Sequence, residues 1–218
     1  MNYGKFQSAI DYTQSFLNAD DFAHTCRVLG YALQILAAEK KADATVVILA
    51  AILHDISRDA HNSTDHAQAG SEKSYTFLVE NGYTDKLARQ VADCILTHST
   101  SSKTQPQTLE AKILFDADKL DTTGAVGAAR AAIQCRHDGK PMYTLGEDGF
   151  PDNKRESASL LGKYRRKLKK LKKIFFTEKA KKIAAKNQPA MDEYFKGFEE
   201  EIDRNYKEGS KLIQKYCK

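Results

Sequence analysis

The segment VVILAAIL, residues 46–53, is the longest purely apolar run in the 218-residue chain, and it leads directly into His54 and Asp55. Eight apolar residues are too few to cross a bilayer, so the run predicts a helix buried in a protein core. Burying the Asp55 carboxylate costs roughly several kcal/mol unless another group compensates. The fold must therefore bring a partner to the end of this helix, either a cation such as Arg58 or a metal ion.

The composition is that of an ordinary globular protein, with 41% hydrophobic and 29% charged residues. These values exclude a disordered or membrane-embedded chain. No basic flank followed by an apolar core opens the sequence, and the four cysteines are isolated from one another. We therefore predict a cytoplasmic protein without a signal peptide, with reduced thiols and no membrane partner.

Apolar residues recur at helical spacing along most of the chain, and no segment sustains the alternation of a strand. An all-α helical bundle is predicted. Asp20 and Asp21 are expected to cap an early helix and Thr177 a late one, and Pro189 is expected to break the chain between the last helices.

A single domain over residues 1–218 is expected, because this length suits one domain. Residues 20–135 would hold its functional core, and the helices of residues 154–218 would pack on that core. Residues 137–153, with five Gly or Pro residues, form the longest predicted loop, and loops of this length are often lids or binding elements.

The net charge of +5 conceals one strongly basic segment. Residues 154–186 hold fourteen Lys or Arg and two acidic residues, a surplus of +12, which leaves −7 for the rest. Within GKYRRKLKKLKKIFF, apolar residues recur at spacings of 4, 3 and 4, as expected for an amphipathic helix over residues 163–173; they are Tyr164, Leu168, Leu171 and Phe175. The lysines are interpreted as its solvated face. Nucleic acid is not an expected partner, although such a patch could attract polyphosphate, nucleotides or RNA.

Two further segments carry residues suited to chemistry. In DFAHTCRV, His24 and Arg27 lie three residues apart and so share a helix face, which the neighbouring apolar residues direct inward. In LFDADKLDTTG, Asp118 and Asp121 share a face, and Asp116 points elsewhere. Taken alone, each of these residues also has a structural explanation, such as a hydrogen-bonded core histidine or a solvated acid.

The order of a histidine, a His-Asp dyad and a later aspartate, each on a different predicted helix, resembles the HD superfamily of metal-dependent phosphohydrolases. The resemblance extends over roughly residues 20–200 and is closest to the stand-alone, largely uncharacterised HD hydrolases. The segments that carry it, in family order, are HTCRV, ILAAILHDISR, HAQAG, ILTHS, TLEAKILFDADKLDTTGAVGAAR and FFTEKAKKIA.

The resemblance implies that one divalent metal ion is bound by His24, His54, Asp55 and Asp118. Two imidazoles and two carboxylates suit Mn²⁺, Fe²⁺, Co²⁺, Ni²⁺ or Zn²⁺, and hold Mg²⁺ less tightly. Such an ion lowers the pKa of bound water from about 15.7 toward about 7 and polarises a phosphoryl oxygen. The expected activity is hydrolysis of a phosphomonoester or nucleotide.

The roles of the other histidines stay open. His66 and His98 match the places that hold a second metal ion in di-metal relatives and that contact phosphate in single-metal ones. They also open and close predicted helices, which is a structural alternative. His61 lies in a polar loop and is expected to be solvated or to face the substrate.

Three cations are candidates for phosphate binding, namely Arg27, Arg58 and Lys119. Arg27 could equally form a buried ion pair with Asp55 or Asp121. Asp121 is expected to orient a histidine ligand, or to act as a general acid or base.

Two other functions remain as alternatives. One is a di-iron oxygenase of the same fold, which requires both His66 and His98 as ligands. The other is a non-catalytic nucleotide-binding regulator. The sequence identifies neither the substrate nor the oligomeric state.

Overall fold

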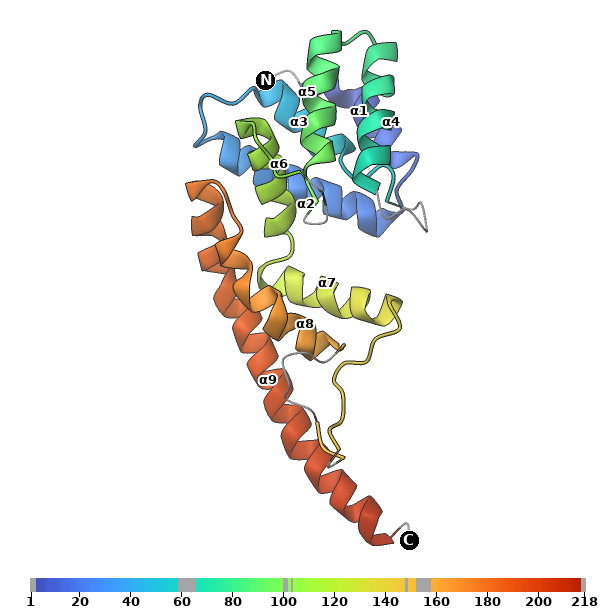
Figure 1. Ribbon diagram of the computed structural model, residues 1–218, viewed down its shortest axis with the longest axis vertical. Helices are drawn as coiled ribbons and strands as arrows, with labels where there is room; N and C mark the ends of the chain where they lie inside the picture. The colour runs from blue at the N-terminus through green and yellow to red at the C-terminus, as the bar shows by residue number, and fades with distance from the viewer. Residues whose placement is uncertain are drawn as a thin grey trace. The chain divides into compact units, whose positions relative to one another are not determined.

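A computed structural model describes residues 3–58, 66–99, 102, 104–147, 149–151 and 158–216 (Figure 1). Within these residues all regular secondary structure is helical, and the one β-type pairing is an isolated bridge between Leu145 and Pro151. The predicted all-α class is confirmed. None of the described helices is both long enough and apolar enough to span a membrane.

The chain divides into two compact units. Residues 1–121 and 175–181 form the first unit, and residues 122–174 and 182–218 form the second. A single domain over residues 1–218 stays a prediction. The elements of the first unit before residue 121 are η1 (Tyr3–Phe6), α1 (Gln7–Gln14), α2 (Ala19–Leu36), α3 (Ala44–Leu53), α4 (His66–Glu80), α5 (Asp85–Leu96) and α6 (Leu109–Leu120).

Helix α3 is the centre of the first unit. Every residue from Val46 to Leu53 is buried, and the helix packs on α1, α2, α5 and α6 (Figure 1). Its N-terminus is capped by Asp43, whose carboxylate accepts from the amides of Thr45 and Val46 at 2.8 and 3.3 Å. The apolar run therefore forms the predicted buried helix, with its C-terminal end fixed inside the protein.

Helix α2 begins slightly before the predicted caps. Asn18 is the N-cap, and its Oδ1 accepts from the amides of Asp20 and Asp21 at 2.9 and 3.0 Å. The prediction that Asp20 and Asp21 cap the helix is therefore wrong. The two acids instead occupy the first turn, where they interact favourably with the positive end of the helix dipole.

The second unit contains α7 (Gly124–His137), α8 (Leu160–Arg166), η2 (Leu168–Lys173) and most of α9 (Glu178–Tyr216). Pro189 lies inside α9, so the predicted break is wrong. Proline removes one helix hydrogen bond, but Met191 and Phe195 continue a fully buried stripe beyond it. Phe195 stacks on Tyr164 with ring centroids 4.0 Å apart, and this packing holds the chain helical past the proline.

The segment predicted as the longest loop connects α7 to α8. Rings at its ends, Tyr143 and Phe150, contact Tyr206 on α9 with centroids 6.1 and 6.5 Å away. Residues 148, 152 and 153 lie outside the described residues, and the role of residues 137–153 as a lid stays a prediction.

Candidate metal centre

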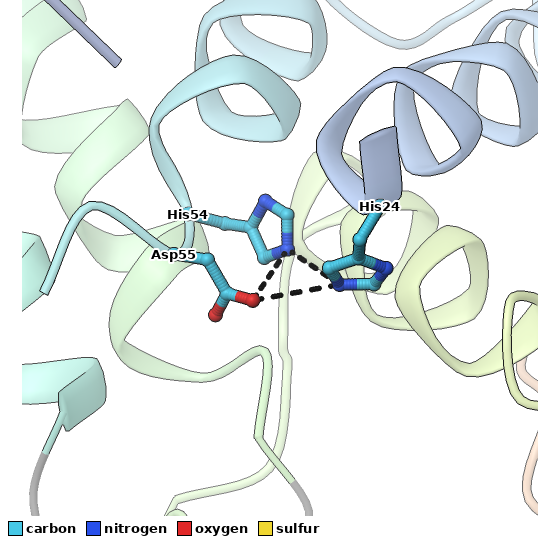
Figure 2. Close-up of side chains that lie close together, drawn as sticks. All are labelled: His24, His54 and Asp55. Carbon is cyan, nitrogen blue, oxygen red and sulfur yellow. Dashed lines mark hydrogen bonds and ion pairs between the residues drawn. The ribbon is translucent and has the colours of Figure 1, made fainter. Parts of the chain in front are cut away.

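The end of α3 delivers two neighbouring side chains with different surroundings. His54 is the C-cap residue and is fully buried. Its Nδ1 lies 2.9 Å from the carbonyl oxygen of Ala51. With the proton on Nδ1, where it donates to that carbonyl, Nε2 carries the lone pair and lies 3.5 Å from Asp55 Oδ2 (Figure 2). A helix end thus fixes the ring and leaves one nitrogen for a ligand.

His24 projects from α2 into the same place. Its Nε2 lies 3.4 Å from His54 Nε2 and 3.4 Å from Asp55 Oδ2 (Figure 2). The donor atoms of these three residues all lie within 4.8 Å of one another. Donor atoms that share one ion at about 2.0–2.2 Å must lie about this close together, so the three side chains suit one divalent ion.

Asp118, from the last turns of α6, lies at the edge of this group. Its Oδ1 is 3.4 Å from His24 Nε2. Its Oδ2 is held in an ion pair by the Nζ of its neighbour Lys119. Asp118 therefore lies close to His24, but it does not belong to the compact group of His24, His54 and Asp55.

Asp121 is hydrogen-bonded to the other ring nitrogen of His24, Nδ1. Its Oδ2 lies 2.7 Å from His24 Nδ1, and both its oxygens accept from Arg27, at 2.7 Å from Nε and 3.1 Å from Nη2. Asp121 is almost fully buried. The contact with Arg27 is one of the two ion pairs considered for that residue, and the orienting role of Asp121 stays a prediction.

Burial and the neighbouring charges shift the pKa values of these residues in different directions. Burial lowers the pKa of His24, but hydrogen bonds that its ring donates to Asp118, Asp121 and Asp55 outweigh burial and raise that pKa to about 10. Burial lowers the pKa of His54 to about 4. Burial would raise the pKa of Asp55, yet the neighbouring histidines and Arg58 hold it well below its usual range. Without an ion, His24 carries the proton that balances the carboxylates.

A second group lies on the other side of Asp55. His98 Nε2 is 3.7 Å from Asp55 Oδ1, and the His66 and His98 rings have centroids 5.7 Å apart. Donor atoms of Asp55, His66 and His98 also lie within 4.8 Å of one another. His66, at the start of α4, is half-buried, and burial lowers its pKa. Asp55 therefore belongs to both groups, through different oxygens.

Arg58 is the cationic partner considered for Asp55, and in the structure the two side chains form an ion pair. Its Nη1 lies 2.5 Å from Asp55 Oδ2, and its Nε lies 3.9 Å from Asp21. The Arg58 side chain is 38% exposed, so it can also meet a ligand from solvent. His61 lies outside the described residues.

Two features of the site are not apparent from residue types alone. The first is the carbonyl of Ile95, which lies 2.6 Å from His98 Nδ1, just as the carbonyl of Ala51 serves His54. Both histidines follow the acceptor by three residues at a helix end, where the ring can reach back to a carbonyl of the last turn; this position is the signal that could have predicted the tautomers.

The second is the role of Asp116, two residues before Asp118. It accepts from the amides of Phe176 and Thr177 at 2.9 and 2.7 Å, and from the Thr177 hydroxyl at 2.7 Å. Asp116 thus fixes the start of α9 and contributes nothing to the metal centre. Thr177 Oγ1 in turn accepts from the Ala180 amide at 3.3 Å, as expected for a cap.

Comparison with known proteins supports a common fold. A family model described as the HD domain matches residues 21–123. YpgQ of Bacillus subtilis, described as an uncharacterized protein, is 28% identical over 186 residues, 84% of each chain. Its crystal structure matches 93% of this chain and 98% of its own with a TM-score of 0.74. The crystal structure of YpgQ in complex with ADP gives 0.72 over 90% and 94%.

A crystal structure of an HD-superfamily hydrolase from Bacillus thuringiensis is also similar, with 26% identity and a TM-score of 0.70 over 92% of this chain and 98% of that one. All residues of the two histidine groups, together with Asp118 and Asp121, lie inside the segment that the HD domain matches. The two histidine groups therefore occupy the shared part of the fold.

Proposed function

Since this chain is an HD-domain superfamily protein, we propose that it is a divalent-metal-dependent hydrolase acting on a phosphoric ester or anhydride of a nucleotide or another small substrate. The observation that carries the proposal is the convergence of His24 Nε2, His54 Nε2 and Asp55 Oδ2 at 3.4–3.5 Å. The other ring nitrogens are already hydrogen-bonded, so these three atoms are the ones directed at a common point.

The residues proposed to hold the ion are His24, His54 and Asp55, with Asp118 as the fourth ligand. Two nitrogens and two carboxylate oxygens suit Mn²⁺, Fe²⁺, Co²⁺, Ni²⁺ or Zn²⁺, and Mg²⁺ more weakly. When bound, such an ion activates water and polarises a phosphoryl oxygen. Asp121 keeps the Nδ1 proton of His24 in place, which leaves Nε2 as the ligand atom.

Two cations lie beside the ligand carboxylates. Arg58 contacts Asp55 and Lys119 contacts Asp118. We propose that both side chains bind phosphate oxygens of the substrate, because a planar guanidinium and an ammonium suit such anions. A nucleotide is favoured because YpgQ, a relative of similar fold, was crystallised with ADP.

A second ion is the alternative arrangement, favoured by the group of Asp55, His66 and His98. Asp55 would then be a ligand of both ions, since its Oδ2 lies 3.4 Å from His24 Nε2 and its Oδ1 lies 3.7 Å from His98 Nε2. The oxygenase alternative requires two irons in this arrangement. Two irons per chain together with oxygen consumption would identify the oxygenase, because the proposed hydrolase uses one or two divalent ions and needs no oxygen.

The test is phosphate release from a panel of nucleotides and phosphomonoesters with Mn²⁺, Co²⁺, Ni²⁺ or Mg²⁺. Wild-type protein should turn over at least one substrate, and Asp55→Asn should lose the activity by at least about 100-fold, because the loss of a carboxylate weakens both the ligand set and its charge. Asp93→Asn, an exposed acid on α5, is the matched control and should keep full activity.

No turnover by folded, metal-loaded wild-type protein would contradict the proposal. Nucleotide binding without turnover would then favour the regulator, and oxygen consumption with two irons per chain would favour the oxygenase.

A further inference from the structure

The proposed hydrolase site makes no use of the segment LKKLKK, residues 168–173. The sequence spacing predicts an α-helix here, but α8 ends at Arg166 and the segment forms the 3₁₀ helix η2. A 3₁₀ helix has three residues per turn and rises about 2 Å per residue, so residues three apart lie in rows along its axis. The three-residue repeat of LKKLKK therefore equals the number of residues in one turn of the helix.

Each row of η2 therefore carries one kind of side chain. Leu168 and Leu171 share the first row and are 3% and 2% exposed. Lys169 and Lys172 form the second row, and Lys170 and Lys173 form the third; all four lysines are exposed. Within a row, neighbouring side chains leave the helix about 6 Å apart. The buried leucines anchor the helix, and the lysines project from it in two parallel lines.

In the part of the chain that the structure describes, none of these four lysines forms an ion pair with an acidic residue. Lys169 Nζ lies 6.0 Å from the centroid of the Tyr164 ring. Arg166 and Lys167, just before η2, are also exposed. The second unit as a whole carries 21 basic and 12 acidic residues, a net charge of +9. The surface of η2 is therefore strongly positive.

In contrast to the expectation from the sequence, we propose that η2 binds the phosphodiester backbone of a nucleic acid. Lysines repeated at about 6 Å in two lines present cations at intervals suited to successive phosphates along a strand. Helix η2 belongs to the second unit, and the residues of the metal centre belong to the first. The proposal thus goes beyond the proposed hydrolysis.

The surroundings of the lysines decide between a nucleic acid and a membrane surface. A helix that binds in the lipid interface needs an exposed apolar face, and no large hydrophobic side chain between residues 158 and 176 is exposed. Helix η2 itself carries no aromatic residue, and the rings that flank it in sequence, Tyr164 and Phe175, are each 5% exposed. Bases therefore find no stacking platform on η2, and binding there should not depend on base sequence.

The experiment is fluorescence anisotropy of labelled 20-nucleotide oligomers, single-stranded and duplex, with two unrelated base sequences of each. Wild-type protein should bind at low salt. The plot of log affinity against log salt concentration should have a slope near −3 for the single strand, at about −0.7 for each of four phosphates. The variant K169E/K170E/K172E/K173E should bind at least about 10-fold more weakly, with a slope close to zero.

The control variant K196E/K207E/K211E/K215E replaces four exposed lysines of α9. It changes the net charge by the same amount as the η2 variant, and it should keep most of the binding. Preference for one polymer form shows whether single strands or duplexes are the ligand. Equal loss in both variants, or no binding by wild-type protein, would overturn the proposal, as would binding to phosphatidylserine vesicles alone. Far-ultraviolet circular dichroism and thermal unfolding show that each variant is folded.

Discussion

At the scale of single residues, the site depends on which nitrogen of each histidine carries a proton. His24, His54 and His98 each place Nδ1 against a buried acceptor, a carboxylate in the first case and a helix carbonyl in the other two. Each Nε2 is thereby left for a ligand. Residue types alone do not reveal this; the positions of the acceptors do.

Replacing Asp121 by Asn should test how far His24 depends on its support. The amide keeps roughly the shape of the carboxylate but loses its charge, so the hydrogen bonds to His24 and Arg27 weaken. Supporting residues of this kind typically change metal affinity by about 10–100-fold, and we expect Asp121→Asn to weaken Mn²⁺ binding by that amount in calorimetric titration. Asp93→Asn should leave the affinity unchanged, and an unchanged affinity in Asp121→Asn would rule out the orienting role.

Metal binding should also release a proton from His24. Its pKa of about 10 means that the ion-free protein holds this proton at pH 7. An ion at Nε2 must displace the proton, so affinity should rise with pH, by about tenfold per unit below that pKa. Calorimetry in three buffers of different ionisation enthalpy should show close to one proton released per ion at pH 7. Zero protons with an affinity independent of pH would show that His24 is not a ligand.

At the scale of helices, local sequence rules and tertiary packing share the outcome. The buried α3 and the cap at Thr177 follow from residue type and spacing. Pro189 and η2 do not. A buried stripe through Met191 and Phe195 keeps α9 helical past the proline, and a three-residue repeat in LKKLKK also suits a 3₁₀ helix.

The candidate site was partly predictable for the same reason. The dyad and His24 are ordered by helices whose apolar faces the sequence shows, and the resemblance to the HD superfamily indicated which residues would meet. Neighbours in sequence were a poorer guide. Asp116 and Asp118 are two residues apart, yet Asp116 binds the start of α9 and Asp118 approaches His24.

That division of labour predicts opposite effects for two similar variants. Asp116→Asn replaces an acceptor with an NH₂ group beside donors at Phe176 and Thr177, which should lower the free energy of unfolding by about 1–3 kcal/mol. Its metal affinity should stay at the wild-type value. Asp118→Asn should weaken metal binding and affect stability less. Urea unfolding and calorimetric titration measure the two quantities, and a loss of metal affinity in Asp116→Asn equal to that in Asp118→Asn would contradict the assignment.

At the scale of the whole molecule, charge and chemistry are segregated. Both histidine groups belong to the first unit, which carries 13 basic and 17 acidic residues. The lysine rows belong to the second unit, whose charge is +9. Residues 175–181 of the first unit include the beginning of α9, and the remainder of that helix lies in the second.

This segregation predicts where a bound ion should stabilise the protein. An ion held by α2, the end of α3 and α6 binds only the folded first unit, so it should suppress local opening there by mass action. We expect saturating Mn²⁺ to slow amide hydrogen exchange in α2, α3 and α6, and to leave exchange in residues 190–216 of α9 nearly unchanged, because local openings there do not disrupt the ligand set. Asp55→Asn, measured with the same Mn²⁺ concentration, should lose the slowing in α2, α3 and α6. Equal slowing along the full length of α9 would instead show that the two units open as one cooperative structure, and would contradict the expectation of separate stability.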